Sequence, residues 1–333
     1  MTSRAVLVTG GAGYIGAHTC KALAAQGYMP VTFDNLSTGH RDFVKWGPLV
    51  IGEIIDADAV ASALHRYDVS AVIHFAAHAN IGESVSEPRK YYENNVAGSL
   101  SLLRGMARAG VDKFIFSSTC AIYGQPEHVP VAESERPRPI TPYGVSKLMV
   151  EQIATDFRSA YDLAFTALRY FNASGADPDC ELGELRDPET HLIPRAMMAL
   201  QGHIDDFQVF GTDFPTPDGT AVRDYIHVSD LADAHVLAVA DLLDGGQGDV
   251  FNLGAGKGHS VKQVLDAIAI ETGLPLPAPS GPKREGDAAS LFADAALARQ
   301  RLGWRPKASD LATIVRSAWR WHRKAHPKRN RPG

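Results

Sequence analysis

Two side chains that could transfer a proton stand four residues apart, Tyr143 and Lys147. Residues at this spacing share one face of a helix, so a helix beginning here would hold the phenol beside the ammonium. Tyrosine is a weak base near pH 7, but a cation about 4–6 Å away favours its phenolate. The pair therefore predicts a general base for an alcohol or sugar hydroxyl, although a plain surface pair has the same spacing.

A hydroxyl-rich segment, Ser117 to Thr119, follows the apolar run at 114–116. Ligands of parallel sheets bind beyond the carboxyl ends of the strands, where this segment would lie. We expect Thr119 to donate a hydrogen bond to the reacting oxygen. A hydroxyl that only forms a turn is the alternative interpretation.

Three glycines at a spacing of three, Gly10, Gly13 and Gly16, follow the apolar run at 5–9. In a dinucleotide-binding turn the first makes the tight turn, and the second lets the backbone approach a pyrophosphate. The third lets the following helix pack against the strand. That helix would present free N–H groups to an anion. A strand before the loop and a helix after it favour nucleotide binding over an ordinary glycine-rich turn.

Asp34 closes the next apolar run, at 30–33. It lies about 20 residues beyond the glycines, where an acid binds the ribose hydroxyls of adenosine. A carboxylate at that place repels a 2′-phosphate, so NAD is the predicted cofactor rather than NADP. Taken alone, Asp34 would be interpreted as a helix cap or a turn residue.

The elements that must position these residues alternate along the chain. Strands are expected at 49–51, 71–75, 114–116, 165–168 and 250–253, and helices at 56–65, 88–109, 143–161, 194–201, 230–240 and 260–272. The predicted fold class is α/β, a doubly wound parallel sheet of Rossmann type with a smaller C-terminal substrate-binding cap domain. The NAD-binding domain would take residues 1–171 and about 223–254, and the substrate domain about 172–222 and 255–333.

Composition limits the partners. The 333 residues carry a net charge of −5, so no nucleic acid is expected, and we find no apolar run long enough to suggest a membrane partner. We expect no metal and no disulfide framework, because there are too few cysteines and they lie far apart: Cys20, Cys120 and Cys180. A cytoplasmic protein is the default expectation.

Seven stretches, in their order along the chain, resemble the nucleotide-sugar epimerases of the extended short-chain dehydrogenase/reductase family: 9–16, 34–36, 91–96, 143–147, 169–172, 222–228 and 284–287. The first five are shared across that superfamily. Asn172 and the last two stretches are more particular to the epimerases. The match covers nearly the whole chain and implies an NAD-dependent isomerase that interconverts UDP-glucose and UDP-galactose.

The resemblance also implies roles. Tyr143 would remove the proton of the sugar 4-hydroxyl while hydride passes from C4 to bound NAD. The 4-keto sugar would then rotate and receive the hydride on its opposite face. Lys147 would contact the nicotinamide ribose, and Thr119 the sugar. A homodimer through the helices near 88–109 and 143–161 is implied as well.

The implied binding residues fall into two sets. The cofactor set is Gly10, Gly13, Tyr14, Ile15, Gly16, Asp34, Asn35, Glu53, Ile54, Phe75, Asn94, Lys147 and Tyr170. The UDP-sugar set is Thr119, Tyr143, Asn172, His191, Leu192, Phe210, Arg223, Arg284, Asp287 and Leu291. In this set Leu291 would wall the pocket beside the sugar 2-substituent, or would instead be an apolar strand residue facing the core.

Three positions depart from the family pattern. Glu53 stands where an aspartate is usual near the adenine, and Ala79 where many members have a lysine near the cofactor. His191 replaces an asparagine beside the uridine. These changes put single contacts in doubt and leave the implied mechanism intact.

Other functions remain open at this stage. The substrate could be another UDP-sugar, such as UDP-N-acetylglucosamine or a UDP-pentose. A dehydratase is less favoured, because similar dehydratases place Asp-Glu directly after the Ser/Thr, and this chain has Cys120 and Ala121 there. A non-catalytic NAD-sensing module would not need Tyr143, Lys147 and Thr119 together.

Overall fold

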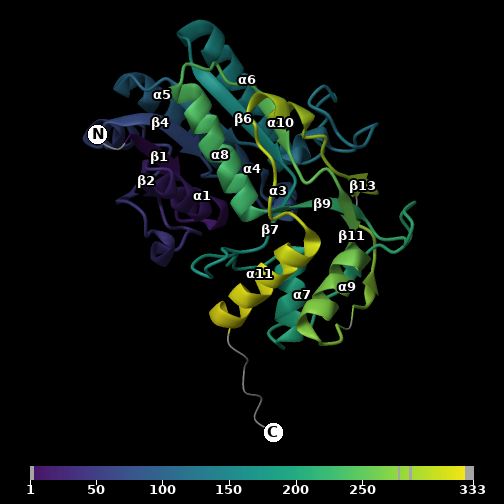
Figure 1. The fold of residues 1–333 in the computed structure, drawn as a ribbon. Helices are drawn as coiled ribbons and strands as arrows, with labels where there is room; N and C mark the ends of the chain where they lie inside the picture. Colours follow the sequence, from purple (N-terminus) through teal and green to yellow (C-terminus); the bar gives the residue numbers. More distant parts are fainter. Residues whose placement is uncertain (1–3, 277, 285–286, 327–333) are drawn as a thin grey trace.

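The structure is a computed structural model, which describes residues 4–276, 278–284 and 287–326. Its central element is a seven-stranded sheet made of β1 Ala5–Thr9, β2 Met29–Asp34, β3 Leu49–Ile51, β4 Val69–His74, β5 Lys113–Ser117, β6 Ala164–Tyr170 and β10 Val250–Leu253. The strand order is β10-β6-β5-β4-β1-β2-β3, and each neighbouring pair is parallel (Figure 1).

Helices cover both faces of this sheet. They are α1 Tyr14–Ala25, η1 Arg41–Phe43, α2 Ala57–Arg66, α3 Ile81–Ser86, α4 Pro88–Tyr91, η2 Tyr92–Gly98, α5 Ser99–Ala109, η3 Cys120–Tyr123, α6 Pro142–Tyr161 and α8 Val228–Leu243. On one face α1 packs against α8, and on the other α2 packs against α5 (Figure 1).

The first strand shows why two layers of helices are needed. Val6 and Val8 belong to the core that includes residues of α1 and α8, whereas Ala5 and Leu7 belong to the core of α2 and α5. Side chains of a strand alternate between its faces, so a strand that is apolar throughout must be covered on both. The predicted doubly wound sheet is confirmed.

The second half of the chain builds smaller sheets. In one of them β9 Val222–His227 pairs with β7 Asn172–Ser174, β11 Gly258–Ser260 and β13 Ser290–Leu291, and a separate pair joins β8 Val209–Phe210 to β12 Ser280–Gly281. The accompanying helices are α7 Leu192–Leu200, α9 Val261–Thr272, α10 Ala296–Arg301 and α11 Leu311–Ala325. Helices α7, α9 and α11 pack together around their own apolar core (Figure 1).

The boundary between the two halves differs in one detail from the expectation. The segments expected to return to the main sheet do so, because α8 packs on it and β10 forms its edge. Strand β9 pairs within the smaller sheet instead, so the return begins after His227. The division into two domains stays a prediction, and residues 1–3, 277, 285–286 and 327–333 of its ranges lie outside the described residues.

The stretch 88–109, expected as one helix, is interrupted. Between α4 and α5 the segment Tyr92–Gly98 is a π-helix. Such helices are rare in proteins, but those that do occur often lie at functional sites. Inside it, the Asn95 side chain bonds the backbone N–H and carbonyl of His78 at 2.9 and 3.0 Å and the Ser146 hydroxyl at 3.1 Å. These tertiary bonds hold η2 against the loop after β4 and against α6.

Two predictions about where helices begin and end are confirmed. Ser260 and Gln263 form the expected capping box at the start of α9, and Gly110 ends α5 in the left-handed conformation. Within the described part of the chain, no helix has both the length and the apolar character needed to cross a membrane.

Candidate active site

The glycine loop between β1 and α1 brings backbone segments into close approach. Gly10 has φ +72°, and a Cβ there would lie 2.7 Å from the amide nitrogen of Ala76, just beyond β4. A Cβ on Gly16 would lie 2.2 Å from the Gly10 carbonyl oxygen. Gly13 caps α1 without a side-chain hydrogen bond, which leaves the first-turn N–H groups for an anion. The loop thus fits a dinucleotide phosphate.

Asp34 lies beside this loop at the end of β2. Its carboxylate accepts hydrogen bonds from the N–H groups of Ala12 at 3.0 Å and Leu36 at 2.8 Å. Burial raises the pKa of Asp34, and these two hydrogen bonds oppose the rise. The next predicted cofactor residue, Asn35, donates its amide to Glu53 at 3.0 Å, so two residues of the predicted cofactor set lie side by side.

Three further residues of the predicted cofactor set surround the same edge of the sheet. The side chain of Ile54 lies against Gly98 at the end of the π-helix. Asn94, inside that helix, donates to Asn95 at 2.9 Å. The ring of Phe75 follows β4 and packs on His235 with 4.6 Å between ring centroids.

Helix α6 positions the predicted base. Thr141 caps the helix, and Tyr143 in its first turn is 8% exposed. Burial raises the pKa of the Tyr143 phenol above its usual value, while a hydrogen bond with Thr119 acts in the opposite direction. Thr119 and Tyr143 therefore lie side by side in the structure, and their catalytic roles stay predictions.

One turn further along α6, Lys147 is also buried. Its ammonium donates to the Ser117 carbonyl at 2.8 Å and lies 4.8 Å from the centroid of the Phe116 ring. Burial lowers the pKa of Lys147 to about 7, and the carboxylate of Glu151 opposes this shift. The action of Lys147 on the Tyr143 phenolate stays a prediction.

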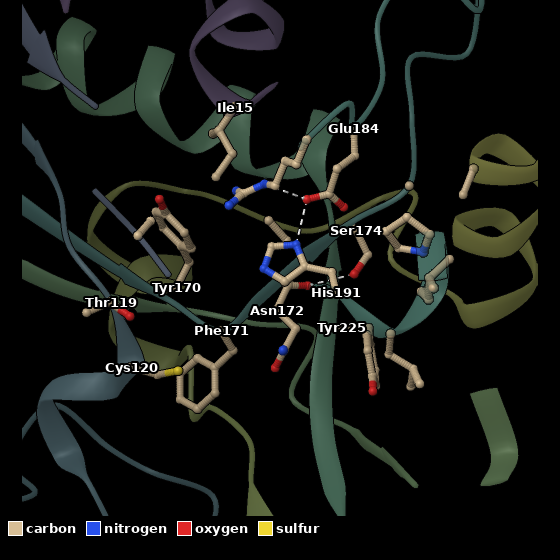
Figure 2. Close-up of a pocket in the computed structure, with 18 of the residues that line it drawn as sticks. Ile15, Thr119, Cys120, Tyr170, Phe171, Asn172, Ser174, Glu184, His191 and Tyr225 are labelled. Atoms are coloured by element: carbon tan, nitrogen blue, oxygen red, sulfur yellow. Dashed lines mark hydrogen bonds and ion pairs between the residues drawn. The ribbon is translucent and has the colours of Figure 1, made fainter. Parts of the chain in front are cut away.

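A cleft of about 1070 Å³, its open mouth included, runs between the sheet edge and the smaller half (Figure 2). Its lining contains seven of the predicted site residues: Ile15, Thr119, Tyr143, Tyr170, Asn172, His191 and Leu192. The Tyr170 hydroxyl lies 2.7 Å from the hydroxyl of Ser117. Tyr14, also predicted to bind the cofactor, donates its hydroxyl to the carbonyl of Gly175 at 2.6 Å. It thereby ties α1 to the loop after β7.

The remaining predicted substrate residues form a second group beside the cleft. Arg223 lies 3.4 Å from Asp287, and the guanidinium of Arg284 lies 4.1 Å from the centroid of the Phe210 ring. Leu291 pairs with Arg223 between β13 and β9. It packs against the same apolar cluster as Cys120 and contains no atom that lines the cleft, and its predicted place beside the sugar stays a prediction. Glu285 and Gly286 of the motif lie outside the described residues.

The site also contains charged residues that the sequence did not single out. Glu184 accepts from His191 Nδ1 at 2.5 Å and from Arg186 Nε at 3.0 Å, and all three line the cleft (Figure 2). One side-chain oxygen or nitrogen atom each from Glu184, Glu189 and His191, of the kind that can bind a metal ion, lies within 4.8 Å of the other two. The positive charge of Arg186 already compensates the negative charge of the Glu184 carboxylate. These contacts depend on the folding of the loop at 175–191, and no periodicity or motif announces them.

A family model supplies the deciding comparison. The model of the NAD dependent epimerase/dehydratase family matches residues 6–254. The chain belongs to this family. The matched range contains the glycine loop, Asp34, Thr119, Tyr143 and Lys147.

Similar proteins cover almost the entire chain. The UDP-glucose 4-epimerase of Rhizobium meliloti is 52% identical, over 97% of this chain and 98% of that protein. The crystal structure of UDP-glucose 4-epimerase from Brucella ovis in complex with NAD is 52% identical with a TM-score of 0.94, covering 96% of this chain and 98% of that one. The enzyme of Bifidobacterium longum, in complex with NAD+ and UDP, is 37% identical with a TM-score of 0.92, covering 97% and 99%.

Proposed function

We propose that this member of the epimerase/dehydratase family is a UDP-glucose 4-epimerase, an NAD-dependent isomerase of UDP-glucose and UDP-galactose. The observation that carries the proposal is the cleft that joins Tyr143 and Thr119 to Asn172, His191 and Leu192. The end-to-end similarity to epimerases crystallised with NAD, or with NAD+ and UDP, supports it.

The chain's own residues account for the proton chemistry. Tyr143, as the phenolate, removes the proton of the sugar 4-hydroxyl, and Thr119 bonds the same oxygen. Lys147, fixed by the Ser117 carbonyl, supplies positive charge beneath the reacting groups. NAD, when bound, supplies a reversible hydride acceptor. Asp34 would hold the ribose of this cofactor, and the N-terminus of α1 would bind its diphosphate.

The UDP part of the substrate is assigned to the group beside the cleft. Arg223 and Arg284 carry planar forks of donors, which suit a diphosphate. Phe210 and Asp287 lie against these arginines and would complete the nucleotide contacts. His191 keeps one ring nitrogen on Glu184 and can offer the other to the uridine.

The test of the function is a panel of UDP-sugars separated by chromatography after incubation with the protein. We expect interconversion of UDP-glucose and UDP-galactose without added reductant. Conversion of UDP-N-acetylglucosamine or a UDP-pentose in preference to these would assign the chain to another epimerase specificity. A protein that converts none of them would instead support the NAD-sensing interpretation.

We predict that the purified protein carries NAD without any being added, since the cofactor is reduced and reoxidised within one turnover. Denaturation followed by an enzymatic assay of the supernatant measures NAD and NADP separately. Asp34→Asn should retain less NAD, because the neutral amide accepts hydrogen bonds from the ribose more weakly. A predominance of NADP would contradict the role of Asp34.

Leu291 provides a prediction about the sugar. If Leu291 walls the pocket beside the sugar 2-substituent, Leu291→Tyr should reduce kcat/KM for UDP-N-acetylglucosamine about tenfold and spare UDP-galactose. Leu291→Ser should raise the N-acetyl activity, and a tenfold change corresponds to about 1.4 kcal/mol. Both kcat/KM values on all three proteins give the ratio. An unchanged ratio would show that Leu291 is only a packing residue.

We also propose a homodimer through the neighbouring α5 and α6. Large apolar side chains on these helices are partly exposed, Leu100 at 39% and Met149 at 40%. Light scattering on the purified protein measures the mass of the particle in solution.

A cytoplasmic location suits an enzyme with free thiols at Cys20, Cys120 and Cys180, and localisation of the tagged protein tests it.

A further inference from the structure

Arg186 brings a positive charge to the cleft from a loop that contains none of the seven stretches on which the family resemblance rests. Arg186 lies in the loop at 175–191, and its side chain is 32% exposed toward the cleft that it lines together with Ile15, Tyr143 and Tyr170. The guanidinium is held through Nε by Glu184 at 3.0 Å. Glu184 is itself fixed, because its side chain is 7% exposed and also bonds His191.

The charge of Arg186 acts on three tyrosine side chains. The Arg186 guanidinium lowers the pKa of Tyr14, Tyr143 and Tyr170, opposing the larger effect of burial on each phenol. Tyr14 is the first residue of α1, whereas Tyr143 and Tyr170 flank the proposed reaction centre. Figure 2 shows Ile15, Tyr170 and Glu184 around the same end of the cleft. Arg186 therefore shares the cleft with Ile15 near the N-terminus of α1 and with Tyr143, the proposed base.

A dinucleotide bound to this fold must pass through that space. Its diphosphate lies at the N-terminus of the first helix, and its nicotinamide must reach the group that exchanges a proton with the substrate. Because the ion pair uses Nε, the terminal nitrogens of Arg186 remain for a ligand, and we find no partner for them among the described residues. A guanidinium fork matches two phosphate oxygens.

We propose that Arg186 binds the diphosphate of the dinucleotide cofactor and that Glu184 positions it, so that the loop at 175–191 closes over the cofactor. This inference rests on the proposed function, since it requires a bound dinucleotide. It assigns to the smaller half of the chain a cofactor contact in addition to its substrate contacts. It also gives a physical reason for retention of the cofactor through many turnovers.

The test compares Arg186→Gln with Arg186→Lys and with Arg320→Gln. The lysine variant keeps a charge without the fork. Arg320 is an exposed control, which bonds the carbonyl of Pro178 in the same loop at 3.2 Å. Each protein is stripped of nucleotide, and its affinities for NAD, ADP-ribose and UDP are measured by calorimetry.

We expect Arg186→Gln to weaken both NAD and ADP-ribose roughly 10- to 100-fold, the scale of hydrogen bonds to a charged group. Arg186→Lys should fall between it and the wild type. UDP should bind equally to all the variants, and Arg320→Gln should match the wild type throughout. A loss of UDP affinity with NAD unchanged would overturn the proposal, as would unchanged affinities for all three ligands. Wild-type protein that binds no NAD would refute the proposed function itself.

Discussion

Replacing Tyr143 by phenylalanine is expected to lower kcat roughly 100-fold or more, the usual scale for losing a positioned acid–base group. The substitution removes only the hydroxyl, so the ring keeps its place in the first turn of α6 and its edge contact with Tyr91 at 6.4 Å. NAD content and thermal stability should therefore change little. Turnover of UDP-galactose, measured with the NAD content of each preparation known, checks this. A variant with near-wild-type turnover would disprove the proposed base.

Lys147→Ala is the companion variant for this experiment. Without the cation the phenolate is less favoured, so the acid limb of the kcat–pH profile should move to higher pH. In the wild type, burial brings the pKa of Lys147 to about 7. The protonated fraction of Lys147 therefore falls as the pH rises through that value.

The parts of the site that the sequence predicts are those set by local geometry. Tyr143 and Lys147 were placed together by the period of one helix, and Gly10 was placed by the turn between one strand and the next helix. The apolar run at 5–9 has no polar face, which requires a strand covered on both sides. Each of these inferences needs only residues close in the chain.

The parts that the sequence misses depend on distant contacts. Strands β7, β11 and β13 have two or three residues, too few for alternation to be seen. The π-helix at Tyr92–Gly98 is held by Asn95, whose partners His78 and Ser146 lie 17 and 51 residues away. The Glu184–Arg186 pair belongs to a loop whose composition indicates only turns.

A buried ionic network beneath the proposed catalytic residues is also built from contacts between residues that are distant in the chain. Glu151 on α6 accepts from Arg169 on β6 at 2.5 and 3.0 Å and from Ser118 at 2.5 Å, while Arg169 also donates to Tyr123 at 2.9 Å. The side chains of the pair are 6% and 8% exposed. The network joins the carboxyl ends of β5 and β6 to the helix that carries the proposed base. Its members are distant in sequence, and the chain alone gave no sign of their pairing.

We expect Arg169→Met to cost about 3–5 kcal/mol of the free energy of unfolding, because it leaves Glu151 as a buried and uncompensated carboxylate. The double variant Glu151→Gln with Arg169→Met should lose less than the single one, since no unpaired charge then remains in the core. The matched control is Arg138→Met, which breaks the exposed pair with Glu127 at 2.8 Å and should cost at most about 1 kcal/mol.

Urea unfolding at one fixed, saturating NAD concentration measures all these proteins on the same scale, because bound cofactor stabilises each by mass action. The order of the variants is the decisive result. A buried ion pair is strongly destabilising when one partner is removed, yet nearly neutral when both charges are replaced. If Arg169→Met unfolds no more readily than Arg138→Met, the network contributes little to holding α6 against the sheet. The position of Tyr143 would then depend on the other contacts of α6, such as the hydrogen bonds of Lys147 with Ser117 and of Ser146 with Asn95.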